Sequence, residues 1–287
     1  MTIRLALGAA LALFAAACSQ PQVPATPALW EVSGPDGQHG YLFGTIHALP
    51  AHVDWQSGRI DAALERADRL VLEIRQLDDS AAMQAIFTRL ARTPGQPPLS
   101  AKVGAPYREA LAKLMQQAGL KEAQFADVET WAAALTLAQA ARGAADGEGV
   151  DRALMAMAGT KPVEELEGTA RQLGLFDALP EEEQRDLLDA VVAEAASAAS
   201  NENRIEGYWR KGDMAAIARE TGRGMLADPE LRQALLVDRN TAWADRVAAM
   251  LQARQRPFVA VGAAHMAGDE GLPALLAQRG YTVRRVQ

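Results

Sequence analysis

Short apolar runs rich in β-branched residues recur along the chain and predict its strands. Each run is bounded by glycine, proline or charged residues. Runs of this kind are typical of buried parallel strands, which are apolar on both faces. The turn Gly34-Pro-Asp-Gly37 indicates that the first two strands pair as a hairpin. The predicted strands are Ala28–Val32, Gly40–Phe43, Arg69–Ile74, Lys161–Leu166, Pro257–Val261 and Tyr281–Val286.

Alanine, leucine, glutamate and glutamine at helical spacing fill the segments between these strands. Pro180, followed by three glutamates, predicts the start of a long helix that ends near Arg210. Asp228-Pro229 predicts the start of another, and Gly280 ends the last one. The predicted helices are 60–67, 80–91, 104–118, 127–142, 150–158, 180–210, 228–255 and 271–278.

This order of elements predicts an α/β fold with a small mixed sheet. Two long helical insertions interrupt the strands, over residues 75–160 and 167–256. No repeat of solenoid period is present in the sequence. We therefore expect one α/β domain over residues 29–287.

The N-terminus has the pattern of a secretory signal peptide over residues 1–17. Arg4 precedes an apolar stretch, and Ala15-Ala16-Ala17 lies before Cys18. Small residues before a cysteine resemble the signal-peptidase II site of bacterial lipoproteins, so we expect lipidation of Cys18; simple cleavage at the same bond is the alternative. Ser19 after the cysteine resembles an outer-membrane sorting signal. Residues 18–28, with three prolines, are expected to form an extended tether.

Charge and rare residues narrow the chemistry further. The formal net charge is −7, from 29 basic and 36 acidic residues, which argues against a nucleic-acid partner. A single cysteine excludes an intrachain disulfide and a site of several thiolates. Past the signal no apolar run is long enough to span a bilayer, so we expect contact with a membrane by the lipid anchor alone.

Four predicted strands end in residues that can carry chemistry. One runs into Gly44-Thr-Ile-His47 and another into Gly262-Ala-Ala-His265, while Glu73 and Glu167 end the remaining two. Ligands of open α/β sheets bind beyond the carboxyl ends of the strands. If these strands are parallel neighbours, two imidazoles and two carboxylates meet in one crevice. The glycines let the backbone leave each strand sharply.

The motifs HExxH, GxSxG, GxGxxG and Walker A are absent from the sequence, which disfavours the enzyme classes they mark. Histidine and carboxylate chemistry remains, with or without a metal. Two histidines and a carboxylate can bind Zn²⁺, Mn²⁺ or Co²⁺ and leave positions open for water.

The chain resembles the TraB/GumN family, which includes the Tiki metalloproteases, over about residues 28–286. The resemblance depends on the two GxxH motifs and on further segments in the same order. These are Leu29-Trp30, Leu70–Glu73, Gly149-Val-Asp151, Lys161–Val163, Leu166-Glu167, Arg239-Asn240, Val261–His265 and Gly280–Val283.

The resemblance implies a fold similar to the haem-binding ChaN proteins and the erythromycin esterases (EreA-like). It implies a peptidase that uses Mn²⁺ or Co²⁺, with His47, His265 and Glu73 at the positions of the motif residues. Arg171 departs from the family pattern, which has an acid there, whereas Glu167 and Gln172 agree with it. Peptides or small molecules are the expected substrates.

Each candidate also has a structural interpretation. Glu73 could be a ligand or general base, or it could pair with Arg69 or Arg75. Glu167 has no preferred role, and Asp151 suits the first turn of a helix. Arg239 could stabilise an oxyanion or pair with Asp238 or Asp245. The tryptophans at positions 131, 209 and 243 are expected to pack, the glutamates 181–183 to be a solvated helix start rather than a calcium site, and His39 and His52 to lie at the surface.

Three functions follow as hypotheses. The first is an envelope lipoprotein that is a metal-dependent hydrolase, with His47, His265 and Glu73 at the metal, Glu73 or Glu167 for proton transfer, and Arg239 at the oxyanion. The second is a lipoprotein that binds haem, a metal or a peptide without turnover. The third is an interaction protein that binds a partner through its helical insertions.

Overall fold

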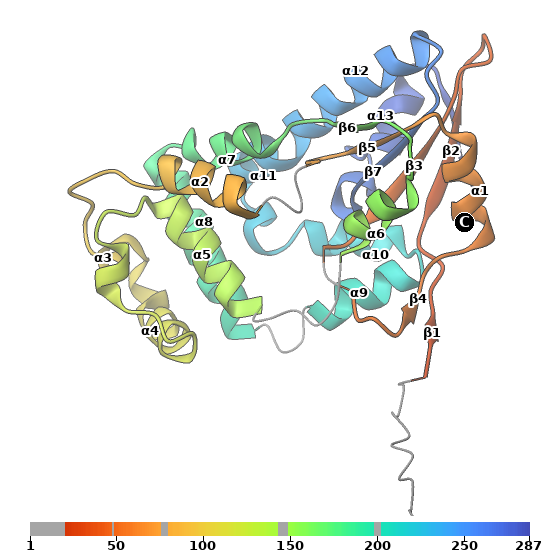
Figure 1. Ribbon diagram of the computed structural model, residues 1–287. Coiled ribbons are helices and arrows are strands. Elements are labelled where there is room, and N and C mark those ends of the chain that lie inside the picture. The colour runs from red at the N-terminus through yellow and green to blue at the C-terminus, as the bar shows by residue number, and fades with distance from the viewer. Residues whose placement is uncertain (1–20, 48, 76–79, 143–148, 198–201) are drawn as a thin grey trace, which may run out of the picture.

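The computed structural model describes residues 21–47, 49–75, 80–142, 149–197 and 202–287. The predicted signal peptide and Cys18 lie outside these residues. A six-stranded mixed sheet has the order β6-β5-β7-β3-β2-β8 (Figure 1). β6, β5, β7 and β3 are parallel, and β2 is antiparallel to both β3 and β8. The strands are β2 Leu29–Ser33, β3 His39–Thr45, β5 Arg69–Leu72, β6 Val163–Glu165, β7 Pro257–Gly262 and β8 Thr282–Arg285. All six predicted strands are confirmed.

Helices cover both faces of this sheet, and the strand pleat explains why both faces are apolar. Tyr41, Phe43 and Phe258 pack on one face, with α1 and α6. Leu42 and Val259 pack on the other, with α12 and α13 (Figure 1). The helices here are α1 Gly58–Arg66, α6 Val150–Met157, α9 Glu202–Arg210, α10 Met214–Thr221, α12 Asp238–Gln252 and α13 Leu272–Gln278.

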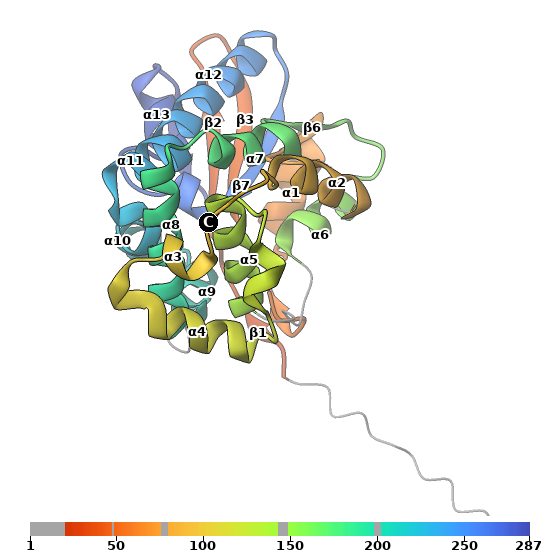
Figure 2. The same cartoon turned by 90° about the vertical axis from the view of Figure 1, so that its left-hand side faces the viewer.

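A second apolar core lies in a helical lobe beside the sheet (Figures 1 and 2). Trp131 is fully buried there, and α5 packs along α8. The lobe combines parts of both predicted insertions, so the two cooperate in one core. Its helices are α2 Ser80–Leu90, α3 Leu99–Lys102, α4 Arg108–Gln117, α5 Thr130–Arg142, α7 Thr169–Asp177, α8 Glu181–Ser197 and α11 Pro229–Arg232.

Three details differ from the sequence predictions. The predicted helix 180–210 is described as α8 and α9, with residues 198–201 between them outside the description. α3, α7 and α10 were not predicted. The helix predicted over 228–255 is present, but Gln233–Val237 form a π-helical turn between α11 and α12. Such turns carry one extra residue and are frequent near functional sites.

Part of the predicted tether is bound to the domain. β1, Val23–Pro24, pairs in parallel with β4, Val53–Asp54, and Ala25 is buried. Proline has no backbone N–H to donate, but this two-residue pairing needs few N–H donors from the N-terminal segment, so Pro24 is compatible with it. In the part of the chain that the structure describes, no helix combines the length and apolar character needed to cross a membrane.

Candidate functional site

The four chemistry-bearing strand ends meet at one edge of the sheet. β3 and β7 are paired up to Thr45 and Gly262, and β5 is paired with β6 up to Leu72 and Glu165. Parallel strands end at the same edge, so the residues that follow them converge. The four predicted groups therefore lie at the same edge of the sheet, although they take up different positions along it.

Glu73 lies at the centre of the site, and its side chain is 10% exposed. Its Oε1 accepts a 2.7 Å hydrogen bond from the Gly262 backbone N–H. Its Oε2 accepts bonds from Arg239 Nη2 (3.1 Å) and Gln172 Nε2 (3.3 Å). Burial raises the pKa of Glu73, but the charge that His265 and His47 carry when protonated, the charge of Arg239 and the Gly262 bond outweigh it, so the pKa lies below its usual value. Glu73 is therefore a carboxylate at neutral pH.

Gly262 allows this contact because of its missing side chain. A Cβ at this position would lie 3.2 Å from Glu73 Oε1, inside normal packing distance. The glycine of the second GxxH motif thus brings a backbone donor to the carboxylate as well as ending the strand.

Arg239 connects three of the sequence-predicted residues. Its Nε and Nη2 donate to Glu167 Oε1 and Oε2, both at 2.9 Å, and Nη2 also donates to Glu73. Its Nη1 lies 3.2 Å from His265 Nε2. Glu167 is more buried than Arg239, with 3% of its side chain exposed against 10% for Arg239. A planar guanidinium suits this arrangement because its donors form a rigid fork.

His265 is buried in the 3₁₀ turn Ala263–Met266 and its hydrogen bonds fix one tautomer. Nδ1 lies 2.6 Å from the Asn240 Oδ1 acceptor, and Nε2 faces the Arg239 donor. Nδ1 must therefore carry the proton and Nε2 the lone pair. Burial, aided by Arg239 and His47 and opposed by Glu73, lowers the pKa of His265 to about 4. His265 is thus a neutral imidazole at neutral pH.

His47 is the exposed member of the site, with 71% of its side chain accessible. Its Nδ1 lies 3.2 Å from Asp151 Oδ2, while Asp151 Oδ1 accepts a 2.7 Å bond from Thr45. The hydrogen bond to Asp151 raises the pKa of His47, although desolvation opposes it. Asp151, which the sequence favoured as a structural helix-start residue, orients His47.

Gly149 explains how Asp151 reaches His47. A Cβ on Gly149 would lie 2.5 Å from the His47 carbonyl oxygen, so only glycine permits the close approach of α6. The Val150 N–H bonds the Ile46 carbonyl at 3.0 Å and fastens the two segments together. The Gly149-Val-Asp151 sequence was a signal for this contact, but its partner lies 104 positions away.

Glu73 and Glu167 both pair with Arg239, in place of the pairs with nearby residues that were the structural alternatives. Arg69 pairs with Asp68 and Glu164, so it does not pair with Glu73. Asp245 pairs with Arg279, at 2.6 Å, so it does not pair with Arg239. Trp243 packs as predicted, with its ring centroid 4.7 Å from Arg239 Cζ and 4.5 Å from the His265 ring.

The donor chemistry fits the divalent ion that the resemblance implies. Nδ1 of His265 faces Asn240 Oδ1, and Nδ1 of His47 faces Asp151 Oδ2. In the neutral tautomer that these acceptors favour, Nδ1 carries the proton and Nε2 has the lone pair. Metal-binding imidazoles are oriented in the same way. Glu73 supplies an anionic ligand. These atoms are not clustered, however. Among the described residues, the three ligand atoms that all lie within 4.8 Å of one another belong to Glu183, Asp228 and Glu230. Closure would need rotation of the exposed His47 and also withdrawal of Arg239, whose Nη1 faces His265 Nε2 and whose Nη2 donates to Glu73 Oε2.

Comparison with protein-family models gives one match, to the TraB/PrgY/gumN family, over residues 28–285. The chain belongs to the TraB/PrgY/gumN family. Neither a comparison with curated proteins nor one with solved structures gives a match. The family match spans the sheet and both helical insertions, so the TraB/PrgY/gumN unit includes the whole site.

Proposed function

We propose that this protein is an envelope lipoprotein that hydrolyses a peptide or a small molecule with the help of a divalent metal. One observation supports this most strongly: Arg239 contacts Glu73, Glu167 and His265 at once, at the edge where parallel strands end. An arginine held by two carboxylates beside a neutral imidazole is a preorganised electrostatic site.

Each site residue has its own role in this proposal. His47, His265 and Glu73 would hold the ion, which when bound lowers the pKa of water and polarises a carbonyl. Glu73 is the candidate general base because it is ionised and lies at the centre of the site, beside Arg239 and His265. Arg239 can stabilise negative charge on a reacting oxygen. We assign Glu167, which is buried against Arg239, to orienting Arg239, and proton transfer to Glu73.

The metal content of the residue 19–287 fragment tests this proposal. The His47→Ala/His265→Ala double variant is compared with His39→Ala/His52→Ala, which also removes two histidines. About one Mn²⁺, Co²⁺ or Zn²⁺ per chain, lost only in the first variant, supports the metal site. Full metal binding by the His47/His265 variant, or none by the wild type after metals are supplied, contradicts it.

The second candidate is a binding lipoprotein without turnover, and the exposed His47 ring favours it. An accessible imidazole can ligate haem iron or a bound metal without a closed active site. Titration with haem should then give an absorbance band that His47→Ala removes. Peptide hydrolysis by the wild type that His47→Ala abolishes would favour the hydrolase.

The lipid anchor is tested separately. Replacement of Cys18 by serine should release the protein from the membrane fraction if Cys18 is acylated. Unchanged membrane fractionation of the Cys18→Ser variant would contradict lipidation.

A further inference from the structure

A cavity of about 440 Å³ opens directly beside the Arg239–Glu167 pair. α7 forms one wall of it, with Leu175, and the continuous α11–α12 segment forms the other, with Ala234. Glu230, Ala234, Asp238 and Ala242 line this second wall at intervals of four residues, so they share one helical face. The cavity shares Glu167 and Arg239 with the candidate site, which makes it a natural place for part of a substrate.

The middle of the cavity is apolar and its far end is acidic. Leu175, Ala178, Leu179 and Ala234 are lining residues that can contact an aliphatic chain. Glu183, from the first turn of α8, and Glu230, from α11, lie at the end away from Arg239. Glu230 precedes Arg239 by nine positions, about 13.5 Å along a helix at about 1.5 Å per residue. An extended lysine or arginine side chain covers about half of that length, and the side chains of Glu230 and Arg239 reach toward it from the two ends.

Among the described residues, no ion pair joins a cation to Glu183, Asp228 or Glu230 at the acidic end. Oxygens of Glu183, Asp228 and Glu230 lie within 4.8 Å of one another, and Glu183 Oε2 is buried without a hydrogen-bond partner among the described residues. Burial and the charges of Asp228 and Glu230 raise the pKa of Glu183, the expected result of packing carboxylates together. A cation at this end would satisfy the free oxygen and relieve the repulsion.

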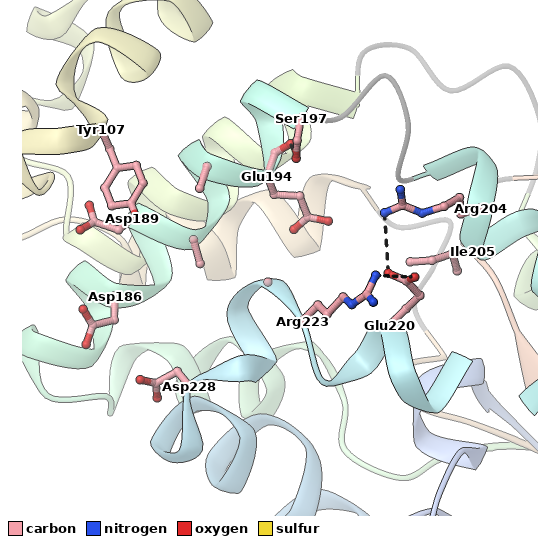
Figure 3. A pocket seen from close by; sticks show the side chains of 13 residues that line it. Tyr107, Asp186, Asp189, Glu194, Ser197, Arg204, Ile205, Glu220, Arg223 and Asp228 are labelled. Atoms are coloured by element: carbon pink, nitrogen blue, oxygen red, sulfur yellow. Dashed lines mark hydrogen bonds and ion pairs between the residues drawn. The ribbon is translucent and has the colours of Figure 1, made fainter. Parts of the chain in front are cut away.

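The neighbouring cavity extends this negative field. It measures about 540 Å³ and is lined by Asp228, which lies within 4.8 Å of Glu183 and Glu230 of the first cavity, so the two cavities adjoin at the carboxylate cluster. In Figure 3, Asp186, Asp189 and Glu194 lie around it, and its two arginines are turned to Glu220. Carboxylates thus exceed arginines on this side of the site.

We propose that the cavity beside Arg239 is a specificity subsite for a lysine or arginine side chain of a peptide substrate. The aliphatic stem packs between Leu175 and Ala234, and the cationic head binds Glu183 and Glu230. The adjacent peptide group then lies at Arg239 and Glu73. This substrate preference rests on the proposed hydrolase function, but the subsite can bind a peptide even if no turnover occurs.

Arg171 is consistent with this arrangement. It lines the same cavity, but it belongs to the first turn of α7, close in sequence to Glu167. Arg171 therefore adds positive charge at the end that receives the peptide carbonyl, where Glu167 and Asp238 also line the cavity. The Glu183 and Glu230 carboxylates lie at the opposite end. The two ends of the cavity therefore differ in charge, whereas the two ends of a purely apolar pocket would not.

The test is peptide binding in the presence of EDTA, so that neither metal nor turnover contributes. Labelled peptides Ala-Ala-Xaa-Ala-Ala with lysine, norleucine or glutamate at Xaa are titrated into the 19–287 fragment. The lysine peptide should bind at least about tenfold more tightly than the norleucine peptide, because the two differ mainly in the charged head. Glu183→Gln/Glu230→Gln should reduce this ratio to within about twofold and leave norleucine binding unchanged.

Two controls complete the design. Asp61→Asn/Glu65→Gln on α1 changes the net charge equally, so it should keep the lysine preference. Ala234→Leu fills the cavity and should weaken the lysine and norleucine peptides alike, with thermal melts to verify folding. Equal binding of lysine and norleucine peptides to the wild type, or a lysine preference that survives the Glu183/Glu230 substitutions, would overturn the subsite. Metal binding that depends on His47 and His265 would stand in either case, so the two proposals fail separately.

Discussion

Arg239 and Glu167 form a two-point ion pair across 72 positions of sequence, with both N–O distances at 2.9 Å. Their side chains are 10% and 3% exposed, so little water is available to replace either partner. Arg239 also contacts Glu73 and His265, and the pair therefore determines the geometry of the whole site.

The first prediction follows from this pair. Arg239→Ala leaves two buried carboxylates without a cation and should lower the free energy of unfolding by about 3–5 kcal/mol. Urea denaturation measures the loss. Arg223→Ala is the control, since Arg223 is 66% exposed and its ion pair should contribute less than about 1 kcal/mol. Similar small losses in both variants would show that the Arg239 network is solvated.

The second prediction concerns the proton on His47. Asp151→Asn removes the charge that raises the pKa of His47, so this pKa should fall in the variant. NMR titration of the imidazole protons measures it, with His39 as an internal reference in the same spectra. An unchanged His47 pKa would contradict the role of Asp151.

The same interaction also predicts a pH dependence of stability. Because the folded pKa is raised, His47 contributes stability below its unfolded pKa of about 6.5, and this contribution is lost as the pH rises through the folded value. The stability advantage of the wild type over Asp151→Asn should therefore be larger near pH 5 than near pH 8. If the stability advantage of the wild type over Asp151→Asn increased with pH, this prediction would be contradicted.

The third prediction uses the opposite shift at His265. Its folded pKa of about 4 lies below the unfolded value, so the metal-free protein should lose stability as the pH falls from about 6.5 through 4. The loss is of the order of 3 kcal/mol. His265→Gln cannot take up this proton and should have a flatter profile over the same range. Parallel profiles would show that His265 is protonated at little cost.

The fourth prediction tests the approach of α6 to His47. Gly149→Ala places a methyl group against the His47 carbonyl and should cost about 1–3 kcal/mol, as overpacking does. It should also lower the His47 pKa, because Asp151 moves away with the helix. Gly58→Ala at the start of α1 meets no atom within 4 Å and should be neutral or slightly stabilising. Equal effects of the two substitutions would exclude the steric explanation.

Local patterns were sufficient to predict the strands and the edge of the sheet that carries the site. Tyr41, Leu42 and Phe43 alternate between the two cores, as the pleat requires, and the run of apolar residues indicated burial on both sides. The family resemblance agreed with this order. α3, α7 and α10 were missed because each is short, four to nine residues, and helices of this length depend on tertiary packing for their stability.

Partners across the site could not be predicted in the same way. Arg239 had acids on its own predicted helix at 238 and 245, and no sequence pattern favoured Glu167, which follows another strand. Asn240 was part of the family pattern but had no assigned role, although it fixes the tautomer of His265. These contacts depend on the register of β5, β6 and β7, which periodicity along one segment does not determine.

The π-helical turn Gln233–Val237 makes the site sensitive to chain length. Each residue of an α-helix turns the next by about 100°, so one deletion in this turn would rotate Arg239 and Asn240 together away from Glu167 and His265. The chain after the turn would still be helical and still end in β7. A homologue shortened by a single residue here could therefore keep the fold and every site residue in its sequence, yet have its arginine aimed at the solvent or at α7.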